Sequence, residues 1–444
     1  MKSIYSFILF LFLCFQLQAQ EWEQVSSLPE AFNNTHHSFG FSLNGMGYIV
    51  TGNSEAGVRS DFYQYDAETD TWTDLGDFPG GARGFAIGDT WDGKAYFGFG
   101  NDGDTRLRDL WVFDPSDMSW TELASCPCER RIHPALIAHN GKVFVGLGGG
   151  NISGNMKDWW EYDIATNSWS QKANLPSVTR HHPYQFGIGD YVYTGLGHGN
   201  GIFNDWYRYD IEEGTWAQMA SLPGEGRVAG TQFSFNNRGY VLSGDGDDHN
   251  SMETGEFWSF DPLTNSWTEL PPHPEGSRWA PASFVIDGEV YIMNGTTYLN
   301  PGNEYVPEIY KFNLWSTFDS DNDGFTADVD CDDENPDINP DAVEIPNNDI
   351  DEDCDGSDLV TSTHQIAGSI INIFPNPAID WITIEGIEDL DFRVSLFDLG
   401  GKEVASQLNA TQLDVNALPN GAYFLEIVDL GTGQRIIEKI MIGN

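Results

Sequence analysis

The chain has 444 residues, and its 68 acidic against 21 basic side chains give a formal net charge of −47. This excess of carboxylates excludes nucleic acid and anionic membranes as partners, because binding to phosphate depends on Lys and Arg. The chain is not a disordered acidic polymer, since 40% hydrophobic and 14% aromatic residues are enough to form packed cores. With 48 glycines and 15 tryptophans the composition favours turn-rich β structure, and the length predicts two or three domains.

Residues 1–19 have the features of a secretory signal peptide. Lys2 precedes an apolar run over residues 4–15, and Ala19 provides the small residue expected before a cleavage site. The apolar run is short for a membrane anchor, and no other stretch of the sequence approaches the length that spans a bilayer. We therefore expect an exported protein without a transmembrane segment after signal removal.

Four cysteines remain once the signal is removed, and an even number in an exported chain permits disulfides. Cys126 and Cys128 are separated by a single proline, which leaves open either two free thiols or a strained, reducible ring. Cys331 and Cys354 bracket an acidic stretch. A disulfide between them would stabilise the fold by about 3 kcal/mol, by restricting the unfolded chain.

A motif of an aromatic residue, an aspartate and, six residues after the aspartate, a tryptophan recurs about every 49 residues. The pairs are Tyr65-Asp66, Phe113-Asp114, Tyr162-Asp163, Tyr209-Asp210 and Phe260-Asp261, which precede Trp72, Trp120, Trp169, Trp216 and Trp267. We expect a β-hairpin in which the aspartate accepts hydrogen bonds from the turn and the tryptophan packs between units. Two apolar strands precede each hairpin, and four strands per unit are typical of a propeller blade.

This pattern resembles the kelch family over residues 21–316. Five units carry the motif nearly intact, whereas the sixth has Asn313 in place of the aspartate. Trp22 lies 50 residues before Trp72, so we expect the N-terminal strand to complete the last blade and close the ring. The predicted fold is therefore all-β: a six-bladed kelch β-propeller, an Asp-rich calcium-type loop module and a C-terminal β-sandwich.

Equivalent positions at the start of the innermost strands carry five arginines and three histidines, which we expect at the mouth of the central channel. They are Arg83, Arg131, Arg180, Arg227 and Arg278, with His37, His133 and His182. As a ligand site they suit an anionic sugar or a peptide carboxylate. Alternatively, the arginines pair with acidic loops and the histidines pack locally, as repeated residues often do. The three imidazoles could also bind a metal.

The expected activity is binding of a glycan or an extracellular protein. The alternative is an enzyme, because the chain is similar in size, blade number and export to sugar-acid mutarotases, which would use acid–base groups at the channel mouth. A copper oxidase of the galactose oxidase type is disfavoured, since Cys126 and Cys128 lie in a Pro-containing turn. No organic cofactor is expected, because no Gly-rich phosphate loop precedes a helix.

Residues 319–358 carry 17 acidic side chains and no Lys or Arg. Asp319, Asp321 and Asp323, with Asp330 at the twelfth position and the carbonyl of Phe325 at the seventh, follow the spacing of a calcium loop.

A second cluster in this segment, Asp351, Asp353 and Asp355, repeats the spacing without a twelfth-position ligand, so a second cation remains open. The alternative for the whole segment is a charged linker. The stretch resembles the metal-binding repeat of secreted bacterial proteins related to a methanotroph copper-binding protein, but oxygen ligands favour calcium.

After an expected linker over residues 359–365, residues 366–444 alternate apolar strands with Gly, Pro and Asn turns, which predicts a small β-sandwich. The phrases Pro375-Asn376-Pro377, Gly401-Lys402 and Leu418-x-x-Gly421-x-Tyr423 resemble the C-terminal sorting domain of the type IX secretion system of Bacteroidetes. The resemblance implies a secreted or surface protein that engages the type IX secretion machinery.

Overall fold

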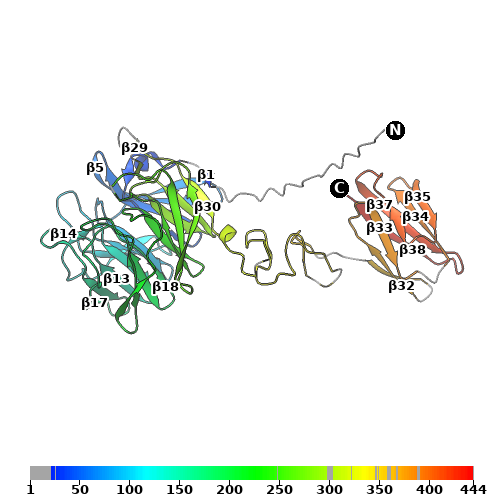
Figure 1. The fold of residues 1–444 in the computed structure, drawn as a ribbon. Helices are drawn as coiled ribbons and strands as arrows, with labels where there is room; N and C mark the ends of the chain where they lie inside the picture. Colours follow the sequence, from blue (N-terminus) through cyan, green and yellow to red (C-terminus); the bar gives the residue numbers. More distant parts are fainter. Residues whose placement is uncertain are drawn as a thin grey trace, which may run out of the picture. The chain divides into compact units, whose positions relative to one another are not determined.

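The computed structural model describes residues 22–25, 27–247, 249–297, 304–321, 323–345, 348, 350–357, 362–366, 369–387 and 391–443. The predicted signal peptide lies outside these residues. The chain forms two compact units, residues 1–317 and 318–444, and each is described by itself (Figure 1). Within the described part of the chain no helix is long and apolar enough to cross a membrane.

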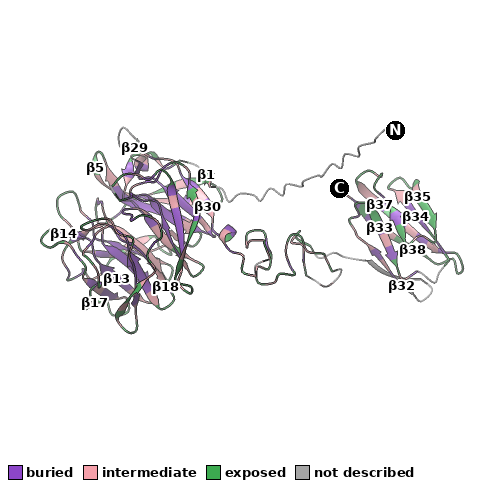
Figure 2. Cartoon of the chain, viewed as in Figure 1, coloured by how far each residue is buried: buried purple, intermediate pink, exposed green. Residues whose placement is uncertain are grey.

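The first unit is a ring of six antiparallel sheets, each with four strands in the order of a propeller blade, and the first sheet has a fifth, short strand β2 (Thr35–His36) that pairs with β4. Blade 1 consists of β3 (Phe39–Leu43), β4 (Met46–Ser54), β5 (Gly57–Asp66) and β6 (Thr71–Asp77), and blade 2 of β7 (Ile87–Trp91), β8 (Lys94–Gly98), β9 (Leu110–Asp114) and β10 (Ser119–Glu122). Blade 3 consists of β12 (Ala135–His139), β13 (Lys142–Gly146), β16 (Trp159–Asp163) and β17 (Ser168–Lys172), and blade 4 of β18 (Tyr184–Ile188), β19 (Tyr191–Gly195), β20 (Trp206–Asp210) and β21 (Thr215–Met219). Blade 5 consists of β22 (Thr231–Phe235), β23 (Arg238–Leu242), β24 (Gly255–Asp261) and β25 (Ser266–His273). The sixth blade is β26 (Ala282–Ile286), β27 (Glu289–Met293), β30 (Tyr310–Asn313) and β1 (Glu23–Gln24). The innermost strands β3, β7, β12, β18, β22 and β26 contact one another in a closed ring, and buried residues run along the blades (Figure 2).

The N-terminal strand closes the ring, as predicted. β1 pairs with β30 so that Glu23 lies opposite Lys311. The Trp22 ring lies 5.2 Å from the ring of Phe312, and its indole N–H donates to the carbonyl of Pro271 in the preceding blade. Trp22 therefore takes the place of the tryptophan that the sixth repeat lacks.

The repeated hairpin also forms as predicted. Each tryptophan of the motif lies opposite the aromatic residue of its own unit, with ring centroids 4.9–5.2 Å apart. The motif aspartates accept hydrogen bonds from turn N–H groups, as Asp66 does from Glu68 and Thr69. The indoles of Trp169, Trp216 and Trp267 donate to a carbonyl of the preceding unit, so the motif ties neighbouring blades together.

The second unit contains a β-sandwich of two four-stranded sheets. One sheet has the order β31 (Ser362–Ile366), β32 (Ser369–Phe374), β33 (Trp381–Glu385) and β36 (Gln412–Asp414); the other has β35 (Glu403–Leu408), β34 (Phe392–Asp398), β37 (Gly421–Asp429) and β38 (Arg435–Ile442). Ile373, Val394 and Leu425 are among the buried side chains of its core. The predicted linker is wrong in its extent, because residues 362–365 form a ladder with β32 instead of a free segment.

Candidate functional site

Six equivalent residues form a ring at one end of the central channel. They are His37, Phe85, His133, His182, Ala229 and Ala280, all with φ between 49° and 59°. This left-handed backbone is uncommon for residues with a Cβ atom and persists only where the surrounding structure enforces it. Here the N–H groups of four ring members donate to the carbonyl of the equivalent residue in a neighbouring blade, over 2.6–3.1 Å. The backbone therefore fixes where these side chains lie.

The ring brings together the three histidines that the sequence places in separate blades. His37 Nε2 lies 2.9 Å from His182 Nε2, and the rings of His133 and His182 stack with centroids 3.4 Å apart. Burial, reinforced by neighbouring imidazoles, lowers the pKa of each of the three well below its ordinary value. They are therefore neutral rings at neutral pH.

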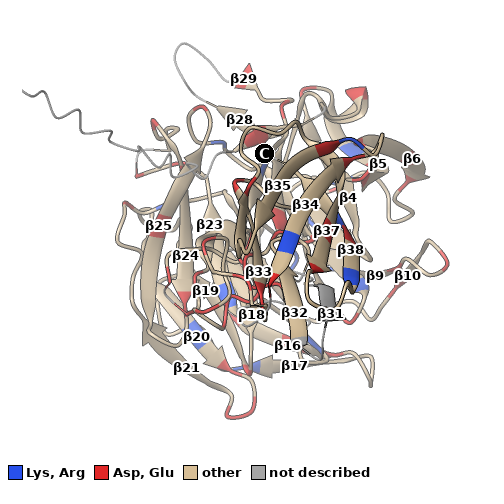
Figure 3. Cartoon of the chain, turned by 90° about the vertical axis from the view of Figure 1, so that its right-hand side faces the viewer, with Lys and Arg blue, Asp and Glu red and all other residues tan. Residues whose placement is uncertain are grey.

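The five arginines do not line the channel mouth as a ligand site would require, and the structure agrees instead with the alternative that they pair with acidic side chains. Each is at most 1% exposed and pairs with a carboxylate: Arg83 with Asp109, Arg131 with Asp158, Arg180 with Asp205, Arg227 with Glu256 and Arg278 with Glu275. None of them is among the described residues that line the central cavity. Each guanidinium group pairs with a carboxylate because a buried charge is costly without a partner. Lys and Arg are also sparse along the ribbon in Figure 3.

The channel itself holds a cavity of about 390 Å³, lined by residues of all six innermost strands. Asp89 lies in its wall and accepts hydrogen bonds from the N–H groups of Thr90 and Ala138 at 2.8 and 3.0 Å. Burial raises the pKa of Asp89 to about 7, against the opposing effect of these two bonds. Trp91 and His139 line the same cavity, with their rings 5.2 Å apart, and burial lowers the pKa of His139.

The sequence holds a signal for this part of the cavity that the motif analysis missed. Asp89 is the third residue of its innermost strand. The other five blades have an apolar residue there: Phe41, Ile137, Phe186, Phe233 and Phe284. A carboxylate that replaces a core residue in one repeat of six marks a position with a role other than packing.

In the acidic segment, the structure brings together three of the four carboxylates of the predicted first cation loop, and Asp330 lies outside this group. Oxygen atoms of Asp319, Asp321 and Asp323 all lie within 4.8 Å of one another. The Oδ2 atoms of Asp321 and Asp330 are inaccessible to solvent and have no hydrogen-bond partner among the described residues. Burial and the neighbouring carboxylates, including Asp323, raise the pKa of both. The N–H of Phe325 donates to Asp323.

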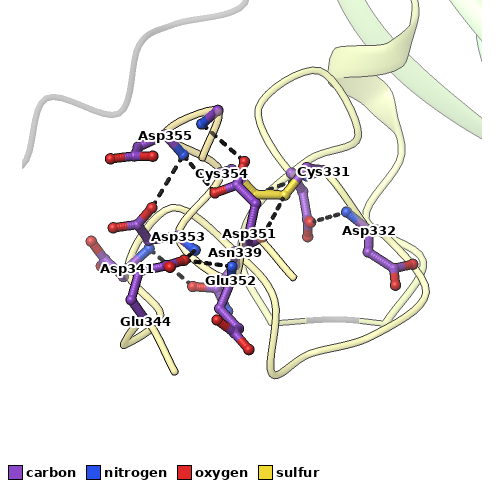
Figure 4. Close-up of a disulfide and its surroundings, with 12 residues drawn as sticks. Cys331, Asp332, Asn339, Asp341, Glu344, Asp351, Glu352, Asp353, Cys354 and Asp355 are labelled. Carbon is purple, nitrogen blue, oxygen red and sulfur yellow. Dashed lines mark hydrogen bonds between the residues drawn. A yellow bond between two sulfur atoms is a disulfide. The ribbon is translucent and has the colours of Figure 1, made fainter. Parts of the chain in front are cut away.

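The second cluster differs from its predicted membership. Asp351 and Asp353 lie within 4.8 Å of a Glu344 oxygen, and the three residues are drawn together in Figure 4. Asp355 lies outside this group, because its Oδ1 accepts the N–H and the hydroxyl of Ser357. Sequence spacing missed Glu344 because it precedes the cluster by seven residues, whereas the loop pattern seeks a ligand after it.

Two disulfides are present in the described residues. Cys331–Cys354, drawn in Figure 4, joins the two acidic clusters as predicted. Cys126 and Cys128 are also bonded, which decides between the alternatives that their spacing left open. None of the six residues that form the ring at the end of the channel is a cysteine.

The fold and these groups define a multidomain β-protein whose propeller encloses a central cavity. Comparison with known families agrees with the three resemblances in the sequence. Residues 97–244 match the KLHDC2/KLHL20/DRC7 Kelch-repeats domain, residues 330–358 match the family described as a putative metal-binding motif, and residues 372–443 match the secretion system C-terminal sorting domain. No curated protein matches the chain.

These matches bear on function at a coarse level. Kelch repeats are typical of a binding module, and the C-terminal sorting domain indicates export through the type IX secretion system. The protein is therefore secreted or held at the outer surface of the cell.

Proposed function

We propose that the propeller binds a glycan in its central cavity. The observation that carries this proposal is the presence of Asp89, Trp91 and His139 in the cavity wall, with Asp89 at a position where the other five blades have an apolar residue. A sugar unit presents hydroxyl groups to polar side chains and a less polar face to an aromatic ring. A cavity of about 390 Å³ is within the range of small-ligand sites.

A neutral sugar suits this cavity better than an anionic one. The five arginines that would have attracted an anion are buried in ion pairs, and the cavity wall contributes Asp89 instead. An extracellular protein is the other partner class, and it would engage the outside of the propeller rather than an enclosed channel.

A glycan array probed with the full chain tests the proposal. We expect hits that are lost in Asp89→Asn and Trp91→Ala but kept in Asp104→Asn, a matched change at an exposed carboxylate. Hits that survive both cavity variants would place binding outside the cavity. Unfolding midpoints of the variants, measured alongside, separate a lost contact from a lost fold.

One observation favours catalysis as a second candidate. A carboxyl group with a pKa of about 7 and a neutral histidine in one cavity could serve as acid and base, as anomer exchange of a sugar acid requires. NMR of anomer exchange should then show acceleration that Asp89→Asn removes. A rate equal to that in buffer excludes this activity.

For the acidic segment we propose binding of calcium at the two carboxylate groups. Clustered oxygen ligands suit a hard cation, and the unpartnered oxygens of Asp321 and Asp330 gain partners when a cation binds. An extracellular module of this kind is expected to bind calcium at about 10⁻⁴–10⁻³ M.

Calorimetry on the full chain checks the calcium proposal. Asp321→Ala with Asp330→Ala should remove the heat of the first site, and Glu344→Ala with Asp353→Ala should remove that of the second. Asp337→Ala is the control, because this exposed carboxylate belongs to neither group. If the titrations of all variants were identical, the calcium proposal would be excluded and the acidic segment would be a charged linker.

A further inference from the structure

We propose that His37, His133 and His182 form a binding site for a divalent transition metal ion of the zinc–copper class, at the end of the propeller channel. This site is independent of the glycan and calcium proposals. Its three ligands come from the ring positions of blades 1, 3 and 4, which the closed propeller brings into contact.

The spacing of the ring nitrogens fits one ion. One nitrogen from each histidine can be chosen so that all three lie within 4.8 Å of one another, and His37 Nε2 is 2.9 Å from His182 Nε2. A tetrahedral zinc ion with bonds of about 2.0–2.1 Å holds its ligand nitrogens roughly 3.3 Å apart. Small rotations of the rings therefore suffice to place an ion among them.

His133 provides a second, independent indication of a ligand. Both of its ring nitrogens are inaccessible to solvent, and neither has a hydrogen-bond partner among the described residues. Buried polar atoms are almost always paired, since an unpaired one loses its contacts with water without compensation. A metal ion bound through one of these nitrogens supplies the missing partner.

One of the three ligands, His37, also has a supporting contact of the kind that metal sites use. His37 Nδ1 forms a hydrogen bond with His36 Nδ1, so Nε2, which lies 2.9 Å from His182 Nε2, is the nitrogen that would bind the ion. The backbone position of each ligand is fixed by the left-handed ring, where the N–H groups of His37, His133 and His182 donate to carbonyls of neighbouring blades.

A row of further imidazoles leads from the surface to the site. The ring of His181 lies 5.0 Å from that of His182 and 5.1 Å from that of His198, and His198 lies 4.4 Å from the exposed His249. These side chains provide successive weak ligands along a path by which an ion could reach the three buried rings.

The donor set also determines the class of metal. Imidazole nitrogen suits zinc, copper and nickel, whereas calcium and magnesium take oxygen ligands. Three protein ligands leave at least one coordination position open. Because all three histidines line the cavity, that position is available to water or to a ligand in the channel.

The test is a zinc titration of the full chain by calorimetry, with calcium in excess to occupy the acidic segment. We expect a single strong site whose affinity falls at least about tenfold in His133→Gln or His182→Gln. His139→Gln is the control, because this histidine lines the cavity but is absent from the cluster. Zinc binding that calcium abolishes, or that the ring variants leave unchanged, overturns the proposal.

Phe85→Ala or Phe85→His extends the test if a histidine variant fails to fold. Phe85 occupies the equivalent ring position, with its ring 4.6 Å from His133 and 4.8 Å from His37. Phe85→His adds a fourth imidazole and should tighten zinc binding by about tenfold or more, whereas Phe85→Ala should not. Equal zinc affinities of these two variants would contradict the site.

Discussion

Two adjacent arginines show how burial, rather than residue type, determines what a side chain does in this propeller. Arg131 is fully buried and donates both to Asp158 and to the carbonyl of Leu147. Arg130 is exposed and donates only to the carbonyl of Arg106 among the contacts described. The equivalent arginine in four other blades therefore reflects a structural contact that each of these blades repeats.

Replacing Arg131 should destabilise the propeller severely. Arg131→Ala removes the donor of the Leu147 carbonyl and leaves the Asp158 carboxylate with the indole N–H of Trp160 but without its counter-charge. Loss of one partner of a buried ion pair costs about 3–5 kcal/mol. Arg130→Ala should change the free energy of unfolding by less than about 1 kcal/mol. Denaturant unfolding of the two variants provides the comparison, and equal losses would show that the Arg131 pair has no special structural role.

Asp89 should make stability depend on pH. Its pKa is about 7 in the folded protein and 3.8 in a free side chain, so between these values the folded state retains a proton that the unfolded state releases. The free energy of unfolding then falls as pH rises through this window.

Asp89→Asn carries no such proton, so we expect its stability relative to the wild type to rise from about pH 4 to pH 7. Urea unfolding of both proteins across this range measures the difference between their free energies of unfolding. The buried histidines have the opposite pH dependence, but they are present in both proteins, so their contribution cancels in this difference. A difference that stays constant from pH 4 to pH 7 would contradict this role of Asp89.

The residue scale is also where sequence reasoning was weakest. Equivalent positions in the repeats identified the arginines and histidines correctly as sets, but not the direction of their side chains. The partner of Arg131 is 27 residues away and precedes another strand, so no local spacing points to it. The repeat pattern does not reveal Asp89, because the other five blades have an apolar residue at the equivalent position.

At the scale of elements, the structures that could be predicted are those whose interacting residues are close in sequence. The Asp-turn-Trp hairpin combines a side chain that caps a turn with one that packs beneath it, and both partners lie within eight residues. The histidine cluster could not be located in the same way, because its members are brought together only by the closure of the ring.

Ring closure depends on a strand of two residues and on Trp22. Removing the indole in Trp22→Ala loses its packing on Phe312 and the hydrogen bond to Pro271, which should cost about 2–4 kcal/mol. An exposed indole of the sandwich, that of Trp381, offers the control variant Trp381→Ala. Thermal unfolding and size-exclusion chromatography should show a less stable, more aggregation-prone propeller for Trp22→Ala only.

The Cys331–Cys354 disulfide should support the proposed calcium sites. It joins the segment that follows the first carboxylate group to the segment that carries the second. Without it the carboxylates repel one another over a longer flexible loop, so Cys331→Ser with Cys354→Ser should weaken calcium binding. Calorimetry in parallel with the wild type measures this, and an unchanged affinity would show that the loops are preorganised without the bond.

At the scale of the whole molecule, the net charge of −47 is unevenly distributed. The acidic segment contributes 17 carboxylates without a single Lys or Arg, whereas the propeller uses carboxylates as partners for its buried arginines. The two compact units therefore differ in the metal chemistry that they offer: clustered oxygens in residues 318–444 and clustered imidazoles in residues 1–317.

This difference predicts that two metals act on separate unfolding transitions of one chain. A ligand that binds only the folded state stabilises the unit that holds it, by about 2.7 kcal/mol at a concentration one hundred times its dissociation constant. In calorimetric scans of the full chain, calcium should raise the transition that Asp321→Ala with Asp330→Ala alters. Zinc should raise the transition that Arg131→Ala lowers. A single transition that responds equally to both ions would contradict the assignment of the two metal chemistries to independent units.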